Sequence, residues 1–220
     1  MKNSELFSPS NTIARRLIES EEYAWDVLPL IEEFIIRVGR TLPPSHYKRI
    51  GRFAYAARDA RIADTAYIGG AVIIDRGAEV RHGAYIRGSA IIGRECVVGN
   101  STEIKNSVLF DGAAAPHYNY IGDSIIGHLA HLGAGAVISN LKSDKSEVTV
   151  SFMSEKIHTG RRKMGAAVGD GVEIGCGAVL TPGTVIGKGT TVYPLVRVRG
   201  YIPPQHILKA EGILVKKEIR

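Results

Sequence analysis

The sequence has few of the features that mark secreted or membrane proteins. It contains two cysteines in 220 residues, Cys96 and Cys176, which are far apart and belong to no CxxC pair. We therefore expect free thiols rather than a disulfide or a metal site. No run of eighteen apolar residues occurs, and the N-terminal segment MKNSELFSPSNTIARR lacks the apolar core of a signal peptide. These absences predict a cytoplasmic protein without a membrane span.

Aromatic residues are also scarce, at 7% of the chain, and the positive charges are scattered. The net charge is +6, but basic residues are dense only at 161–163 and 216–217. A nucleic-acid reader would show a basic stripe with interleaved aromatic residues, or a known module. We therefore expect no nucleic-acid partner, whereas small phosphorylated ligands agree with this charge.

A branched or aromatic residue falls on every sixth position over long stretches of the chain. This register runs from Ile62 to Phe110 and returns over 126–138 and 168–198, often with a small or polar residue next. A period of six fits neither a helix nor a half-buried strand, but it is typical of the hexapeptide repeats of a parallel β-helix. Three hexads form one triangular coil, so the sixth-position residues should stack inside and small residues should occupy the corners.

The first forty residues follow a different pattern. Between Val27 and Val38 the apolar residues have the spacing of one helix face, Asp26 precedes them as a possible cap, and Gly39 follows. We interpret this segment as a helical cap over the open end of the β-helix, with a partner-binding arm as the alternative.

This pattern divides the chain into three parts. The predicted organisation is a helical appendage at 1–45, a β-helix at 50–200 with an inserted loop at 139–166, and a tail at 201–220.

Two basic residues are placed where successive coils should superpose. Arg87 and Lys105 are eighteen residues apart, so they should lie one above the other on the same face. Two cations aimed at one spot would attract a phosphate group. The alternative is a pair of solvated cations on the rim.

Several motifs carry a resemblance to a known family. They are EIKNS at 103–107, APHYNYIGDS at 115–124, LGAGAVISN at 132–140 and TGRRKMGAAVGDGVEIG at 159–175. Together they resemble the acetyltransferase half of bifunctional N-acetylglucosamine-1-phosphate uridyltransferase/glucosamine-1-phosphate N-acetyltransferase and of related sugar-1-phosphate nucleotidylyltransferases, over about residues 80–200. The resemblance implies an all-β, left-handed parallel β-helix with a short N-terminal helical appendage. It also implies a homotrimer that transfers acetyl from acetyl-CoA to an amino-sugar phosphate between subunits.

The same resemblance implies roles for individual residues. His117 matches the general base, Tyr120 matches a tyrosine at the sugar, and Arg87 and Lys105 match the residues that hold the phosphate. Asn140 matches an acceptor-site asparagine, and Lys163 a lysine from another subunit, whereas His131 stands where the family usually has an asparagine. The positions that match the CoA groove are Ala134, Cys176 and Pro194.

The chemistry of this transfer requires few groups. An amine attacks a thioester only when it is unprotonated, so a base such as an imidazole must take its proton. The developing oxyanion needs a donor, for which a backbone N–H of Gly-Ala-Gly at 133–135 is suited. A thioester is already activated, so we expect no metal in catalysis.

The chain also departs from the family. The sequence has no N-terminal glycine-rich phosphate loop, so we expect no uridylyl transfer. We predict a CoA-dependent N-acetyltransferase for an acceptor of the glucosamine 1-phosphate or galactosamine 1-phosphate type. The sequence does not decide which basic residue of the insert meets a ligand among Lys142, Lys145, Arg161, Arg162 and Lys163.

Two other functions remain open at this point. A metal hydratase similar to the γ-class carbonic anhydrases would need three histidines, drawn from His82, His117, His128 and His131. A non-catalytic scaffold that binds sugar nucleotides, and pairs with a separate nucleotidyltransferase, would retain the repeat without turnover.

Overall fold

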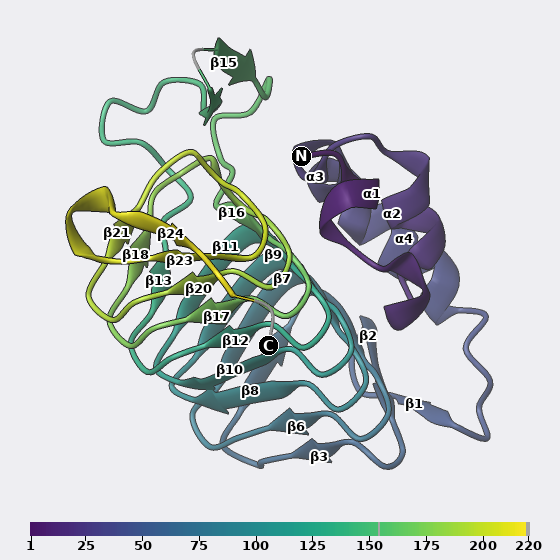
Figure 1. Ribbon diagram of the computed structural model, residues 1–220. Helices are drawn as coiled ribbons and strands as arrows, with labels where there is room; N and C mark the ends of the chain where they lie inside the picture. The colour runs from purple at the N-terminus through teal and green to yellow at the C-terminus, as the bar shows by residue number, and fades with distance from the viewer. Residues whose placement is uncertain (154, 219–220) are drawn as a thin grey trace.

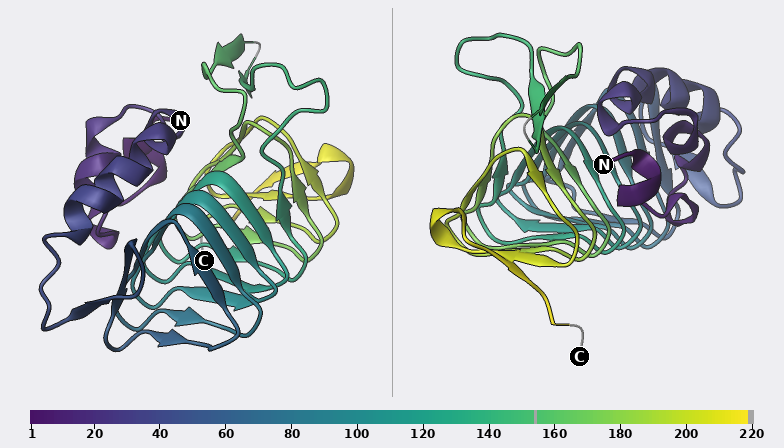
Figure 2. Two further views of the ribbon diagram at one scale, coloured as in Figure 1. Left: turned by 180° about the vertical axis from the view of Figure 1, so that it is seen from behind. Right: turned by 45° about the horizontal axis from the view of Figure 1, so that its top comes forward.

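The computed structural model describes residues 1–153 and 155–218 and consists mainly of short parallel strands (Figure 1). The strands stack coil upon coil, and each coil turns through three faces around a common axis (Figure 2). The predicted all-β class, a left-handed parallel β-helix with a short helical appendage, is confirmed.

Each face is a ladder of strands from successive coils. Face 1 consists of β3 (Arg61–Ile62), β6 (Glu79–Val80), β8 (Val97–Asn100), β10 (Ala114–His117), β12 (His131–Leu132), β17 (Glu173–Ile174), β20 (Thr191–Val192) and β23 (His206–Leu208). Face 2 consists of β4 (Tyr67–Gly69), β13 (Val137–Ile138), β18 (Val179–Leu180), β21 (Arg197–Val198) and the first halves of β7 (Tyr85–Ile92), β9 (Glu103–Leu109) and β11 (Tyr120–Ile126). Face 3 consists of β2 (Phe53–Ala57), β5 (Ala71–Ile74), β16 (Ala166–Val168), β19 (Thr184–Ile186), β22 (Tyr201–Ile202) and the second halves of β7, β9 and β11.

Antiparallel pairs lie at the margins of the β-helix. Strand β1 (Tyr47–Arg49) pairs with β2, and β24 (Leu214–Lys216) pairs with β23. The insert carries a hairpin of β14 (Thr149–Phe152) and β15 (Glu155–His158) (Figure 1). Its first strand packs against the outer surface of face 3, where the ring centroid of Phe152 is 5.0 Å from that of Tyr201. Beyond residue 200 the chain still winds as β-helix, because β22 continues face 3 and β23 continues face 1.

The interior of the prism is the apolar column that the period of six predicts. Ile74, Ile86, Ile92 and Ile104 are fully buried in it, and the later series over 168–198 lines the same core. Burial of a branched side chain stabilises the fold by about 1.5–3 kcal/mol, so the stacked column is the main source of cohesion between coils.

Phe110 is an exception to the predicted column. The chain is one residue shorter between Lys105 and Ser107 than between Arg87 and Ala90, so Leu109 rather than Phe110 lies opposite Ile92. Leu109 takes the interior place, and Phe110 points outward, where its ring centroid is 5.2 Å from that of Phe7. The assignment of Phe110 to the interior was therefore wrong.

The helical segment packs against the side of the β-helix. It comprises α1 (Asn3–Leu6), η1 (Pro9–Asn11), α2 (Arg15–Ser20), α3 (Ala24–Val27), η2 (Leu28–Leu30) and α4 (Ile31–Gly39), and a further short turn, η3, spans Ala210–Gly212. Pro29 lies in η2, between the two halves of the predicted helix. No helix in the described ranges is both long and apolar enough to cross a bilayer.

The expectation that this segment caps an open end is also wrong. Ile31, Phe34 and Ile35 form a second core with outward-facing side chains of face 3, including Ile73 and Ile91. Figure 2 shows the helices alongside the coils rather than across their end. Face 3 is thus apolar on both its surfaces, which leaves faces 1 and 2 to carry polar chemistry.

Candidate functional site

His117 lies at the edge where face 1 turns into face 2, in line with three other residues of predicted function. Parallel ladder hydrogen bonds connect the positions: Gly135 N donates to His117 O at 3.0 Å, Gly177 N to Ala134 O at 2.8 Å, and Leu195 N to Cys176 O at 2.9 Å. Successive coils therefore superpose His117, Ala134, Cys176 and Pro194. We call this column the His117 edge.

The residue after each member of the His117 edge turns the chain with a positive φ. The angle is 38° at Tyr118, 69° at Gly135, 66° at Gly177 and 61° at Leu195. Glycine adopts this conformation without steric cost, whereas a tyrosine or leucine there is strained by about 1–3 kcal/mol. The strained Tyr118 is 60% exposed, and its ring centroid is 6.5 Å from that of His117.

Asn119 fixes the backbone of this corner. Its buried side chain accepts a hydrogen bond from His117 N at 3.1 Å and donates to Gly133 O at 2.8 Å and Ala136 O at 3.2 Å. The imidazole of His117 is exposed and has no hydrogen-bond partner among the described residues. A rigid corner thus presents an imidazole whose ring nitrogens can both meet a ligand.

One backbone donor beside His117 is also free. In Gly-Ala-Gly at 133–135, Gly133 N donates to Ile174 O and Gly135 N to His117 O, so both belong to the ladder. Ala134 N has no acceptor in the part of the chain that the structure describes. The N–H of Ala134 lies one coil from His117 in the same column.

Arg87 and Lys105 lie opposite each other on face 2, as their spacing predicts, but both are paired with carboxylates. Arg87 Nε donates to Glu103 Oε1 at 2.7 Å, and this hydrogen bond raises the pKa of the guanidinium. Lys105 Nζ lies 3.1 Å from Asp123 Oδ2, with the lysine side chain 23% exposed and the aspartate 6%. The two cations are therefore not the free charges that the sequence alone indicated.

Asp123 joins this pair to Asn140 and forms a polar cluster on face 2. It accepts hydrogen bonds from Asn106 Nδ2 at 2.8 Å and from Asn140 Nδ2. Burial raises the pKa of Tyr120, and the charges of Glu103 and Asp123 raise it further, so its hydroxyl remains a hydrogen-bond donor at neutral pH. We call these residues the face 2 cluster: Arg87, Glu103, Lys105, Asn106, Tyr120, Asp123 and Asn140.

A glycine makes room at the centre of the face 2 cluster. A Cβ on Gly122 would come within 2.7 Å of both Asn140 Nδ2 and Tyr120 Oη. These two groups therefore converge over the Gly122 backbone, which only glycine allows.

The side chains of two predicted residues form no hydrogen bond with the face 2 cluster among the described residues. His131 is on face 1, where its Nδ1 lies 3.0 Å from Glu173 Oε2, rather than beside Tyr120. Lys163 is exposed on the returning segment of the insert, where it forms an isolated β-bridge with Leu141, next to Asn140.

The histidines considered for a metal site do not converge. His82 Nδ1 lies 2.7 Å from Thr65 Oγ1, and His128 Nδ1 donates to Asp111 O at a different corner. No group of three or more His, Cys, Asp or Glu side chains with metal-binding geometry occurs within residues 1–153 and 155–218. The geometry therefore gives no support to the hydratase hypothesis within one chain.

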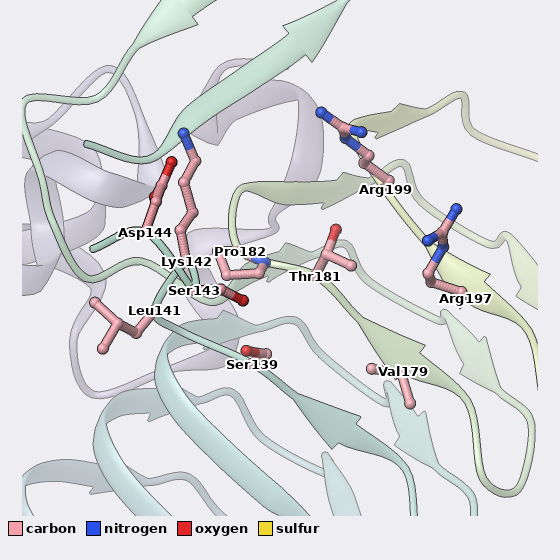
Figure 3. A pocket seen from close by; sticks show the side chains of 10 residues that line it. All are labelled: Ser139, Leu141, Lys142, Ser143, Asp144, Val179, Thr181, Pro182, Arg197 and Arg199. Atoms are coloured by element: carbon pink, nitrogen blue, oxygen red, sulfur yellow. The ribbon is translucent and has the colours of Figure 1, made fainter. Parts of the chain in front are cut away.

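Face 2 also contains a cavity of about 570 Å³, farther along the helix axis and beneath the insert (Figure 3). Its walls come from β18, from the end of β21 and from the first residues of the insert. Arg197, Arg199, Lys142 and Thr181 line it, and neither the motifs nor the resemblance pointed to the two arginines or the threonine. The eighteen-residue spacing of 181 and 199, the same signal used for Arg87 and Lys105, would have placed Thr181 beside Arg199.

Comparisons with known proteins show to which proteins the chain is similar. Residues 68–164 match the family model described as the GMPPB C-terminal domain. A bifunctional sugar-1-phosphate nucleotidylyltransferase/acetyltransferase from Sulfurisphaera tokodaii is 41% identical over 92 residues, which cover 42% of this chain and 23% of that protein. Bifunctional protein GlmU from Methanococcus aeolicus is 33% identical over 115 residues, 52% of this chain and 28% of that protein. The resemblance to the acetyltransferase half of these enzymes is confirmed, and the match spans about a quarter of the relatives' length.

Solved structures with a similar shape include two bacterial proteins. The acetyltransferase domain of PglB from Neisseria gonorrhoeae, in complex with acetyl coenzyme A, has a TM-score of 0.34 at 16% identity, covering 71% of this chain and 54% of that one. WeeI from Acinetobacter baumannii has a TM-score of 0.37 at 17% identity, covering 74% and 57%.

Proposed function

We propose that this protein is a CoA-dependent N-acetyltransferase that acts on an amino-sugar phosphate. The observation that carries the proposal is the His117 edge, where an exposed imidazole and a free backbone N–H lie in one column beside the polar face 2 cluster. The similarity to bifunctional sugar-1-phosphate nucleotidylyltransferase/acetyltransferases supports the same chemistry.

His117 is the proposed general base. The acceptor amine attacks the thioester carbonyl, a C–N bond forms, and the imidazole takes the proton that the nitrogen loses. The C–S bond then breaks, and CoA leaves as its thiolate. General-base assistance of this kind accelerates a reaction by about 10²–10⁴-fold.

Ala134 N–H is the proposed donor to the carbonyl oxygen. Negative charge develops on this oxygen as the amine attacks, and a fixed donor stabilises it without reorganisation. The ladder bonds of Gly133 and Gly135 hold the intervening peptide in place, so the donor is preorganised. Acetyl-CoA would lie along the same edge, against Ala134, Cys176 and Pro194, of which the last two are exposed.

The face 2 cluster is the proposed acceptor site. Tyr120 and Asn140 offer polar groups to a sugar ring, and Arg87 and Lys105 offer charge to its phosphate. Because the two cations are paired with Glu103 and Asp123, a phosphate would share them rather than meet bare charges. In a homotrimer, Lys163 would reach the acceptor that is bound to a neighbouring copy. His131 lies on face 1, so it would contact the acceptor only from that face.

An acetyl-transfer assay tests this function. Purified protein with acetyl-CoA and either glucosamine 1-phosphate or galactosamine 1-phosphate should release free thiol, whereas N-acetylglucosamine 1-phosphate, which has no free amine, should not. The variant His117→Ala should lose at least about 100-fold in kcat. The matched control His46→Ala removes an exposed imidazole next to β1 and should keep full activity.

The assay also separates this proposal from its alternatives. Thiol release at wild-type rate by His117→Ala would exclude the imidazole as the base. Absence of release with both sugar phosphates would reject a free amino-sugar phosphate as the acceptor. Binding of CoA without release in the presence of any amino sugar, free or nucleotide-linked, would favour a non-catalytic scaffold.

A further inference from the structure

The cavity on face 2 has a charge pattern unlike that of the face 2 cluster. Arg197 and Arg199 are alternate residues, so both project from the same side of the chain, about 6–7 Å apart along it. Both are exposed, and neither forms an ion pair with a carboxylate of the described residues. These arginines, rather than Arg87 and Lys105, are therefore the uncompensated cations of this face.

A third cation and one anion complete the electrostatics of the cavity. Lys142 stands on the insert, on the other side of Thr181 from Arg199 (Figure 3), and its ammonium donates to Glu147 O. Asp144 also lines the cavity, and its pKa is lowered because Ser146 N donates to its carboxylate, so it is ionised at neutral pH. Three cations against one carboxylate leave the cavity positive.

Hydroxyl and apolar groups lie between these charges. Ser139, Thr181 and Arg199 share one column of the ladder, because Ser139 N donates to Leu180 O and Thr181 N donates to Val198 O. Thr181 lines the cavity and its hydroxyl donates to Val198 O, whereas Ser139 Oγ has no partner in the described part of the chain. Leu141 and Val179 add exposed apolar surface.

We propose that this cavity binds the diphosphate of a nucleotide, with Arg197 and Arg199 on the phosphates and the nucleoside on the side of Leu141 and Lys142. Paired guanidinium groups match phosphate oxygens bidentately, and a diphosphate carries enough charge for several cations. The volume is within the range of small-ligand sites and exceeds what a lone phosphate fills.

The distance between the cavity and Tyr120 indicates what is attached to the diphosphate. Tyr120, Val137, Val179 and Arg197 are successive partners across the ladder, so three strand spacings, about 14 Å, separate the acceptor tyrosine from the arginine. A sugar at Tyr120 that is linked to a diphosphate can reach the cavity along face 2. The inference rests on the proposed function for the sugar at Tyr120, and it changes one assignment of that function. The acceptor would be an amino sugar joined to a nucleoside diphosphate, whose phosphates would lie on Arg197 and Arg199 rather than on Arg87 and Lys105.

Calorimetric titration of the full chain with UDP tests the cavity without any turnover. We expect saturable binding that weakens at least about tenfold in Arg197→Gln and in Arg199→Gln, because each variant loses charge-assisted hydrogen bonds to the phosphates. The control Arg40→Gln removes an exposed arginine after α4 and should leave the affinity unchanged. Equal affinity in all variants, or no binding of UDP, would overturn the proposal.

Two further arms identify the occupant. His117→Ala should bind UDP as the wild type does, so the cavity is tested even if acetyl transfer fails. If CoA displaces UDP and itself depends on Arg197 and Arg199, the diphosphate in the cavity is that of CoA and the acceptor inference is wrong. A change of molecular mass in the arginine variants, measured by light scattering, would show instead that a second copy of the chain occupies the cavity.

Discussion

Asp123 connects the polar side chains of face 2. It is buried, lies in the left-handed region at φ 48°, and accepts hydrogen bonds from Lys105, Asn106 and Asn140. Aspartate tolerates this backbone conformation better than most residues. The carboxylate both holds the ammonium of Lys105 and fixes the amide of Asn140, so it positions two residues of the proposed acceptor site.

Removal of this charge should destabilise the fold. Asp123→Asn keeps the size of the side chain and its tolerance of positive φ, but it leaves Lys105 facing a neutral amide. We expect the free energy of unfolding to fall by about 1.5–3 kcal/mol, measured by urea denaturation. The control Asp64→Asn alters an exposed carboxylate and should change it by less than about 0.5 kcal/mol. Equal stability of the two variants would mean that the ion pair contributes nothing.

One of the two cysteines is buried and the other is exposed. Cys96 is buried in the column, where desolvation raises the pKa of its thiol and Sγ lies 2.9 Å from Phe110 O. Cys176 is exposed on the His117 edge. The sequence placed both outside disulfides and metal sites, but it did not distinguish the packed thiol from the exposed one.

Close stacking of coils depends on glycines at the corner of faces 1 and 2. A Cβ on Gly99 would lie 1.6 Å from Pro116 O, and one on Gly175 would lie 2.3 Å from Pro194 N. Because both contacts are with backbone, no side-chain movement relieves them. Because Gly99 and Gly175 have no side chain, the coils that carry His117 and Pro194 lie close to the coils that carry these glycines.

Gly99→Ala should therefore disrupt the stack. We expect a loss of at least about 1–3 kcal/mol in the free energy of unfolding, since overpacked sites shift backbone as well as side chains. Gly51→Ala, where φ is not positive and the nearest atom is Ala54 Cβ at 3.2 Å, should change it by less than about 1 kcal/mol. A Gly99→Ala protein as stable as the wild type would show that the coils can separate without cost.

The period of six predicted the coils well, because each interior position has the same environment. It failed at Phe110, because a one-residue shortening between Lys105 and Ser107 moved the register, and a fixed period does not report such a change. The position of the helices was missed for a different reason. An amphipathic helix shows that it covers an apolar surface, but not which one.

The sequence did contain a signal for that surface. On face 3 the outward positions are as apolar as the inward ones, as in AVII at 71–74 and AAV at 166–168, which is typical of strands covered on both sides. For the site, spacing predicted that Arg87 and Lys105 superpose. The same spacing of eighteen also pairs Lys105 with Asp123, so the sequence contains the signal that this cation is compensated.

The molecule as a whole assigns one task to each face. Face 3 is buried by the helices, face 1 carries the ladder that leads into the His117 edge, and face 2 carries both the face 2 cluster and the cavity. The proposed base, His117, and the proposed sugar-contacting residue, Tyr120, lie on either side of one corner, three residues apart. In a homotrimer, the open side of this corner would be closed by a neighbouring copy, to which Lys163 belongs.

A crystal structure of the protein with CoA and glucosamine 1-phosphate tests the central claim most directly. The account predicts the sugar amine about 2.6–3.2 Å from a ring nitrogen of His117. It also predicts the CoA thiol beside Ala134 N–H, and Lys163 of a neighbouring copy near the acceptor. An amine bound on another face, or a CoA thiol away from the His117 edge, would contradict it.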